Sequence, residues 1–133
     1  MSRLCLDTRV YSELRRGTPE VVEILRRAGW VGMPTVVLGE LHAGFLLGGH
    51  RDRNELELEA FLAEPAVTVL GIDAETARHY AALVVALRGA GTPVPTNDIW
   101  IAACAVRHGA TVVTLDGHFQ KMEGVSVQAV RRA

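Results

Sequence analysis

Several residue types that mark common protein classes are scarce in this chain of 133 residues. The two cysteines, Cys5 and Cys104, stand in apolar segments without a Cys-x-x-Cys pair, so we expect free thiols rather than disulfides or a zinc site. Aromatic residues make up 5% of the chain, too few for a series of base-stacking platforms. No apolar run reaches the about 20 residues of a membrane helix, and the N-terminal apolar stretch before Asp7 is too short for a secretory signal. These absences predict a cytoplasmic protein.

A strong charge of either sign is also missing. The formal net charge is -1 and the isoelectric point is near 6.5. The basic residues are thirteen arginines and one lysine, Lys121. Such a chain lacks the positive field with which many proteins hold nucleic acid. If it acts on a polyanion, positive charge must be supplied locally, and a bound divalent cation would supply it.

Several catalytic signatures are absent as well. Gly48 and Gly49 neither follow a predicted strand nor precede a suitably spaced lysine, so no phosphate-binding loop is present. No serine stands in a nucleophile elbow. The histidines form no pair at metal-ligand spacing, and we expect most of them at the surface; they are His42, His50, His79, His108 and His118. The carboxylates remain as the residues that could carry chemistry.

Hydrophobic periodicity predicts an α/β protein with a parallel sheet. The expected strands are residues 4–6, 30–32, 67–70, 111–115 and 125–130. The expected helices are residues 10–14, 19–28, 36–47, 51–63, 74–88 and 99–108. At this length, with no linker or repeat, we expect one domain over residues 1–133.

Turn and capping residues set the expected helix bounds. Thr18, Thr35 and Asp73 are the expected N-caps of three helices. Gly29 and Gly89 are expected to end two of them. The helix at residues 99–108 has almost no polar face, so we expect it to be covered on most sides.

Four acids stand at informative places in this pattern. Asp7 and Asp116 directly follow predicted strands, and Asp98 stands where a helix begins. Taken singly, Asp7 and Asp98 are explained as helix-capping or first-turn acids, and Asp116-Gly117 as a turn. Glu40 differs because its helical spacing predicts a core-facing position, where an unpaired carboxylate is costly.

Taken together, the four acids predict a site. The carboxyl ends of parallel strands share one edge of a sheet, which is where ligands bind in open α/β folds. Two like charges about 5 Å apart repel by roughly 3 kcal/mol at an effective dielectric constant near 20. A hard divalent cation removes this repulsion, and Mg²⁺ or Mn²⁺ suits an all-carboxylate site better than zinc does.

With these residues identified, the sequence resembles the PIN-domain family, specifically the VapC-type toxin ribonucleases of type II toxin-antitoxin systems. The matching segments are residues 4–17, 33–44, 95–110 and 111–127, in the family's order and spacing. The most specific part is residues 97–103 followed by residues 114–119. The resemblance implies a PIN-like three-layer fold with a parallel sheet of about five strands flanked by helices.

The resemblance also implies a site and partners. The four family acids match Asp7, Glu40, Asp98 and Asp116. Of these, Asp7 and Asp98 match the positions tied most directly to metal, while Glu40 and Asp116 complete the site directly or through water. Thr8 and Thr114 are expected to support the acids. The resemblance further implies a homodimer and a cognate VapB-type antitoxin whose tail occupies the active-site groove.

We therefore expect a Mg²⁺- or Mn²⁺-dependent endoribonuclease that acts as the toxin of such a pair. The candidates for RNA contact are four arginines, Arg9, Arg15, Arg16 and Arg51. Arg9 and Gly117 depart from residues frequent in the family at these positions, which leaves target choice open. One alternative is a catalytically silent PIN-like module that binds RNA or protein. A phosphatase forming an aspartyl-phosphate ranks last, because Asp7-Thr8-Arg9 lacks the second aspartate of such enzymes.

Overall fold

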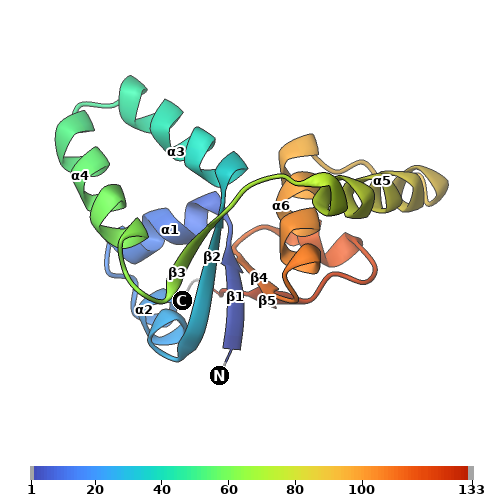
Figure 1. Cartoon of the computed structure of the whole chain (residues 1–133), viewed down its shortest axis with the longest axis horizontal. Coiled ribbons are helices and arrows are strands. Elements are labelled where there is room, and N and C mark those ends of the chain that lie inside the picture. The colour runs from blue at the N-terminus through green and yellow to red at the C-terminus, as the bar shows by residue number, and fades with distance from the viewer. Residues whose placement is uncertain (1, 132–133) are drawn as a thin grey trace.

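The computed structural model describes residues 2–131, so the expected domain of residues 1–133 extends beyond the described residues at both ends. Its centre is a five-stranded sheet in which every pairing is parallel (Figure 1). The strand order is β3-β2-β1-β4-β5. The strands are β1 (Ser2–Leu6), β2 (Ala28–Pro34), β3 (Val67–Leu70), β4 (Thr111–Thr114) and β5 (Val127–Ala129). The predicted α/β fold with a five-stranded parallel sheet is therefore confirmed.

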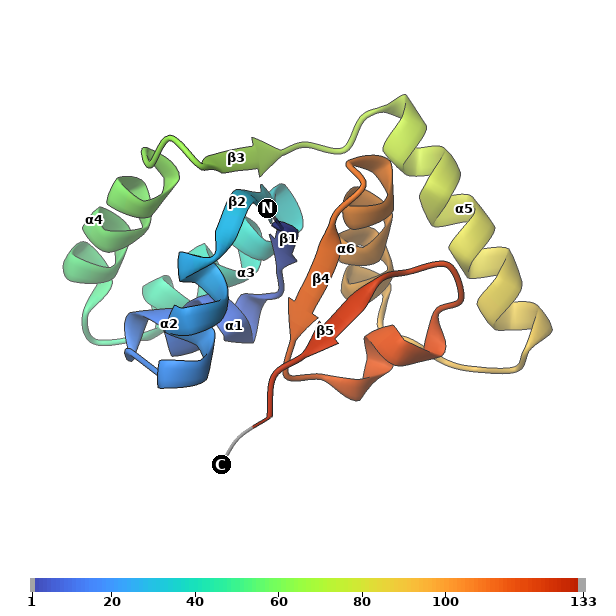
Figure 2. The same ribbon diagram turned by 90° about the horizontal axis from the view of Figure 1, so that it is seen from below.

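Helices cover the sheet in two groups. They are α1 (Thr8–Arg15), α2 (Pro19–Arg26), α3 (Thr35–Leu47), α4 (Arg51–Leu62), α5 (Ala74–Gly89) and α6 (Thr96–Arg107), with a short 3₁₀ turn η1 (Gly117–Lys121). Helices α1, α2 and α4 lie on one side of the sheet, and α5 and α6 lie on the other (Figures 1 and 2). Helix α3 projects from the carboxyl end of β2 and pairs with α4 as a hairpin. No helix within residues 2–131 is long and apolar enough to span a membrane.

The core lies on both faces of the central strands, against α6 on one face and against α1, α2 and α4 on the other. Leu6 of β1 and Val112 and Val113 of β4 are fully buried, as the apolar runs predict for strands covered on both faces. In α6, residues 101–105 are fully buried as well, because the helix packs between the sheet and α5. Cys5 and Cys104 are buried free thiols, as expected.

Several predicted bounds and caps were wrong. Thr35 is the first residue of α3 rather than its cap, since Pro34 takes that position without a side-chain hydrogen bond. Gly29 lies inside β2, because α2 ends at Arg26 and the strand begins earlier than expected. Thr18 does occupy the N-cap position of α2, but its hydroxyl donates to Glu13 at 2.6 Å instead of capping the helix. Of the three residues Thr18, Thr35 and Asp73, Asp73 alone caps its helix as predicted, accepting a hydrogen bond from the Thr76 N–H.

Two further elements differ from the prediction in length. Helix α6 begins at Thr96, three residues earlier than expected, so Asp98 lies within its first turn. Strand β5 covers only Val127–Ala129, because the chain before it is occupied by the 3₁₀ turn and the bend that follows. The earlier start of α6 matters for the site, since it fixes Asp98 to a rigid helix rather than to a loop.

Candidate active site

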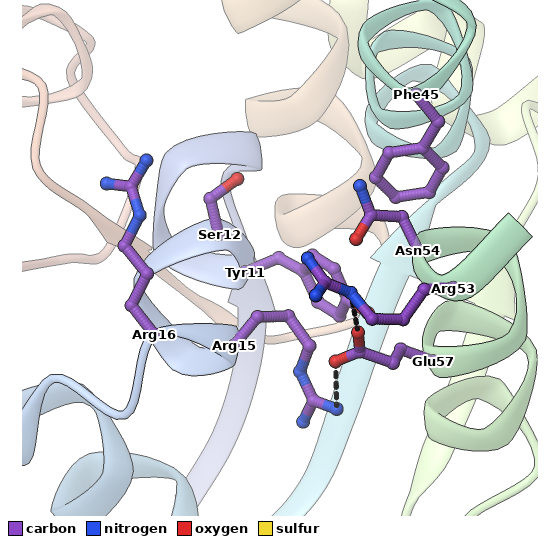
Figure 3. Close-up of a pocket in the computed structure, with 8 residues that line it drawn as sticks. All are labelled: Tyr11, Ser12, Arg15, Arg16, Phe45, Arg53, Asn54 and Glu57. Atoms are coloured by element: carbon purple, nitrogen blue, oxygen red, sulfur yellow. Dashed lines mark ion pairs between the residues drawn. The ribbon is translucent and has the colours of Figure 1, made fainter. Parts of the chain in front are cut away.

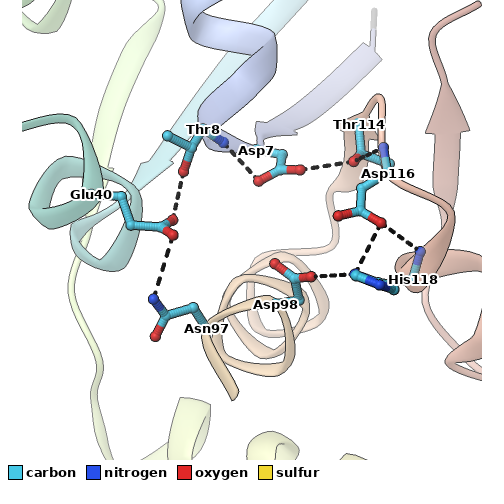
Figure 4. Close-up of polar contacts among 8 residues, drawn as sticks. All are labelled: Asp7, Thr8, Glu40, Asn97, Asp98, Thr114, Asp116 and His118. Atoms are coloured by element: carbon cyan, nitrogen blue, oxygen red, sulfur yellow. Dashed lines mark hydrogen bonds and ion pairs between the residues drawn. The ribbon is translucent and has the colours of Figure 1, made fainter. Parts of the chain in front are cut away.

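Polar side chains from four parts of the chain form a ring beyond the carboxyl ends of β1 and β4 (Figure 4). Hydrogen bonds and ion pairs join its members, except that Asn97 and Asp98 are joined as neighbours in the chain. We call this set of eight residues the carboxylate ring. Its members are Asp7, Thr8, Glu40, Asn97, Asp98, Thr114, Asp116 and His118. All four acids predicted from the sequence belong to it. Residues far apart in the chain are thus brought together at one edge of the sheet, where ligands bind in open α/β folds.

Asp7 is the most buried acid of the ring, with 6% of its surface exposed. It follows β1 and is the N-cap of α1, where one carboxylate oxygen accepts a hydrogen bond from the Thr8 N–H at 2.7 Å. The other oxygen accepts from the Thr114 hydroxyl at 2.8 Å. The capping interpretation of Asp7 therefore holds for one oxygen, while a neighbouring strand fixes the other.

Glu40 joins the ring from the α3 side. The Thr8 hydroxyl donates to Glu40 Oε1 at 2.6 Å, and Asn97 Nδ2 lies 3.4 Å from Glu40 Oε2. Glu40 is exposed, so the prediction that it faces the core was wrong. The reason is that α3 projects from the sheet and buries only Val37 and Leu41, so apolar neighbours on this helix do not mark a core face.

The remaining two acids meet at an imidazole. His118 Nδ1 lies 3.0 Å from Asp98 Oδ2 and 2.9 Å from Asp116 Oδ1. Asp116 also accepts a hydrogen bond from the backbone N–H of His118 at 3.0 Å, which caps the 3₁₀ turn. Its own N–H donates to the Thr114 hydroxyl at 2.8 Å, and this contact closes the ring back to Asp7.

The contact of His118 with two acids was not predicted from the sequence, in which the histidines form no pair at metal-ligand spacing. The sequence places it two residues after Asp116, which is a poor spacing for ligands on a helix. In the 3₁₀ turn, however, the chain folds back so that the imidazole reaches Asp116 and Asp98 together. An acid followed two residues later by histidine, in a turn beyond a strand, is the signal that could have identified it.

Two of the acids are held in surroundings that disfavour their charge. Burial raises the pKa of the Asp7 carboxyl, and the neighbouring Asp98 and Glu40 carboxylates raise it further, against hydrogen bonds from Thr114 and Thr8 that lower it. Burial also raises the pKa of Asp98, and Asp116 and Glu40 add to this, whereas His118 opposes it. Within residues 2–131, no arginine or lysine forms an ion pair with any of the four acids. Positive charge from outside the chain would relieve this repulsion.

The donor set suits a divalent cation. Ligand atoms of Asp98, Asp116 and His118 lie within 4.8 Å of one another. Asp7 stands outside this group of three and is connected to Asp116 through Thr114. Carboxylate oxygens are the ligands that Mg²⁺ and Mn²⁺ prefer, and an imidazole nitrogen adds a donor that transition metals accept.

The four arginines predicted to contact RNA are placed differently from one another. Arg9 and Arg51 are exposed at the beginnings of α1 and α4. Arg15 and Arg16 line a pocket of about 540 Å³ between α1 and α4 (Figure 3). Arg15 lies 4.0 Å from Glu57 in an ion pair, and Arg16 lies 3.4 Å from Glu13. These two side chains are therefore partly engaged within the chain.

Comparison with known proteins places the chain in one family. The PIN domain family model matches residues 4–125. Ribonuclease VapC4 of Mycobacterium tuberculosis is 36% identical over 128 residues, covering 94% of this chain and 95% of the relative. The plasmid stability protein StbB of Pseudomonas syringae is 34% identical, and the match covers 85% of this chain and 87% of the relative.

Solved structures agree with the sequence relatives. The VapBC-5 toxin-antitoxin structure from Mycobacterium tuberculosis matches with a TM-score of 0.75 and 30% identity, covering 99% of this chain and 100% of that chain. DNA-bound VapBC from Salmonella typhimurium matches with a TM-score of 0.85 and 25% identity, covering 97% of this chain and 98% of that chain. On this evidence the chain belongs to the PIN-domain family and is a relative of its VapC ribonucleases.

Proposed function

We propose that the chain is the ribonuclease toxin of a toxin-antitoxin pair, which hydrolyses RNA phosphodiester bonds with the help of Mg²⁺ or Mn²⁺. The observation that carries the proposal is the ring of four carboxylates without an arginine or lysine partner within residues 2–131. It occurs in a chain that matches a VapC ribonuclease over 94% of its length. Acids arranged only for stability would be expected to have cationic partners or full solvation.

The site residues are assigned by position in the ring. We assign Asp7 and Asp98 as the main cation ligands, with Glu40 and Asp116 completing the site directly or through water. The raised pKa values of Asp7 and Asp98 support this assignment, because a cation stabilises the charged form that the protein alone disfavours. The donor set accepts either Mg²⁺ or Mn²⁺.

The side chains of the ring have distinct tasks in this proposal. A bound divalent cation supplies Lewis-acid chemistry, activating water and neutralising phosphate charge. Thr114 fixes one oxygen of Asp7 and the backbone of Asp116, so it holds two acids at a set spacing. Glu40 is exposed and its carboxylate is held by Thr8 and Asn97, which suits it to accept a proton from the attacking water.

The proposed partners follow from the relatives. Structures of related chains are VapBC toxin-antitoxin complexes, and we propose a VapB-type antitoxin for this chain, together with a homodimeric toxin. RNA would be steered by Arg9, Arg15, Arg16 and Arg51. Of these, Arg9 and Arg51 are exposed and have no ion-pair partner within residues 2–131. A short reading frame for a DNA-binding protein beside the gene would support the pairing.

The decisive experiment uses purified protein freed of any antitoxin. We expect cleavage of RNA with Mg²⁺ or Mn²⁺, none with a chelator, and loss by a factor of about 10² or more in Asp7→Asn. A silent binding module would bind RNA equally well with and without metal and would leave it intact. Metal-independent cleavage by the pure protein that survives Asp7→Asn would contradict the proposed site.

A further inference from the structure

His118 lies where two ring acids converge. Its Nδ1 atom is 3.0 Å from Asp98 Oδ2 and 2.9 Å from Asp116 Oδ1. Its Nε2 atom makes no hydrogen bond to any other described residue. The side chain is 38% exposed, so this outer nitrogen can carry the ring proton and leave the lone pair of Nδ1 directed at the acids.

These separations also match those between neighbouring ligands of one cation. In an octahedral site with bonds of about 2.1 Å, adjacent ligand atoms lie about 3.0 Å apart. The distances from His118 Nδ1 to the two carboxylate oxygens agree with this spacing of adjacent ligand atoms. The three donors come from two separate elements, the first turn of α6 and the turn η1, and each is held by local backbone structure.

The chemistry of the donor decides what it would select. Mg²⁺ is bound almost entirely by oxygen, whereas imidazole nitrogen is a good ligand for divalent transition metals. We propose that His118 gives the site a nitrogen ligand through Nδ1 and thereby makes it favour Mn²⁺ over Mg²⁺. The inference rests on the proposed divalent-cation site and specifies its metal preference. It assigns a binding role to a side chain outside the four family acids.

A simpler role for His118 is to hold Asp98 and Asp116 by hydrogen bonds. Asparagine separates the two roles, because its amide can still donate to a carboxylate but offers a metal only oxygen. His118→Asn should therefore keep the acids in place while removing the nitrogen ligand. His42→Asn is a matched control, since His42 Nδ1 also lies 2.9 Å from a carboxylate, that of Glu55, and its side chain is 47% exposed.

The test measures binding rather than cleavage. Mn²⁺ affinity is measured on the intact chain by the electron paramagnetic resonance signal of free Mn²⁺, and Mg²⁺ affinity by competition. We expect wild type and His42→Asn to bind Mn²⁺ about tenfold more tightly than Mg²⁺, and His118→Asn to lose most of that ratio. Pulsed electron paramagnetic resonance of wild type labelled with ¹⁵N-histidine should show a nitrogen coupled to bound Mn²⁺, and His118→Asn should lack it.

The outcomes separate the inference from the proposed function. If Mn²⁺ binds without nitrogen coupling and His118→Asn keeps the wild-type ratio, the cation site stands and the role of His118 is overturned. If wild type binds neither metal, both fail together. The nitrogen coupling is read on wild-type protein, so it distinguishes the two roles of His118 even if the variant fails to fold.

Discussion

Two groups of acids lie beyond strand ends in this fold, and their surroundings have opposite effects on the charge of the carboxylates. Asp73 follows β3 by three residues, and Asp7 directly follows β1. Asp73 accepts hydrogen bonds from the backbone and hydroxyl of Thr76 and lies 3.3 Å from Arg107, which also pairs with Glu75 at 2.9 Å. The carboxylate ring has hydroxyls, an amide and one imidazole instead of an arginine.

The pKa values express this difference. Hydrogen bonds from Thr76, with a smaller contribution from Arg107, lower the pKa of Asp73 to about 2 against an opposing effect of burial. Burial and neighbouring acids raise the pKa values of Asp7 and Asp98 instead. A strand-end position alone therefore does not mark a candidate site. What distinguishes the ring is that its acids converge on one another while lacking an arginine or lysine partner within residues 2–131.

Cleavage provides the largest expected contrast between the two groups. Asp98→Asn should reduce metal-dependent RNA cleavage by a factor of about 10² or more, because a cation ligand is lost. The same variant should leave the metal-free protein as stable as wild type or more so, since it removes a carboxylate whose charge is disfavoured. Initial cleavage rates and thermal melting with a chelator measure both effects.

Asp73→Ala is the matched change in the other group. It should keep the cleavage rate and lower the melting temperature by a few degrees, because it removes the N-cap of α5. If Asp98→Asn instead lowered the melting temperature as Asp73→Ala does and cleaved RNA normally, Asp98 would be an ordinary first-turn acid of α6.

Thr114 offers an intermediate effect within the ring. Its buried hydroxyl donates to Asp7 and accepts from the Asp116 N–H, so Thr114→Val leaves two polar groups without a partner. We expect a loss of roughly 1–3 kcal/mol in the free energy of unfolding. The pKa of Asp7 should also rise further, because the Thr114 hydrogen bond lowers it.

Urea unfolding measures the stability change, with Thr114→Ser as the control that keeps the hydroxyl. A loss of stability in Thr114→Ser with none in Thr114→Val would mean that the methyl group, and not the hydroxyl, makes the contribution. The contact between β4 and Asp7 would then be packing rather than polar support.

The sequence predicted the sheet because each strand carries its own local signal. The apolar runs at Leu4 to Leu6 and at Val112 and Val113 predict buried strands without any information on which strands pair. The positions of Asp7 and Asp116 follow directly, since the carboxyl ends of parallel strands share an edge. Periodicity therefore sufficed for the fold and for two of the four acids.

The remaining parts of the ring depend on information that periodicity lacks. The exposure of Glu40 depends on how far α3 projects from the sheet, and the mostly apolar sequence of this helix does not indicate that. The contact of His118 depends on a 3₁₀ turn of five residues, too short for a periodic pattern. Both features are set by the geometry of tertiary packing and turns.

The pH dependence of stability gives the smallest and sharpest contrast. A carboxyl group whose pKa is higher in the folded than in the unfolded state does not lower stability below its unfolded pKa, because it is protonated in both states. It lowers stability as the pH rises through its folded pKa, because the folded state disfavours its charge. With metal removed, the stability advantage of Asp98→Asn over wild type should therefore shrink as the pH falls from about 7.5 to about 4. The penalty of Asp73→Ala should hardly change over that window, because the lowered pKa of about 2 keeps Asp73 charged in the folded state. Melting curves of the three proteins at several pH values test this, and parallel pH profiles for all of them would mean that the two groups of acids do not differ electrostatically.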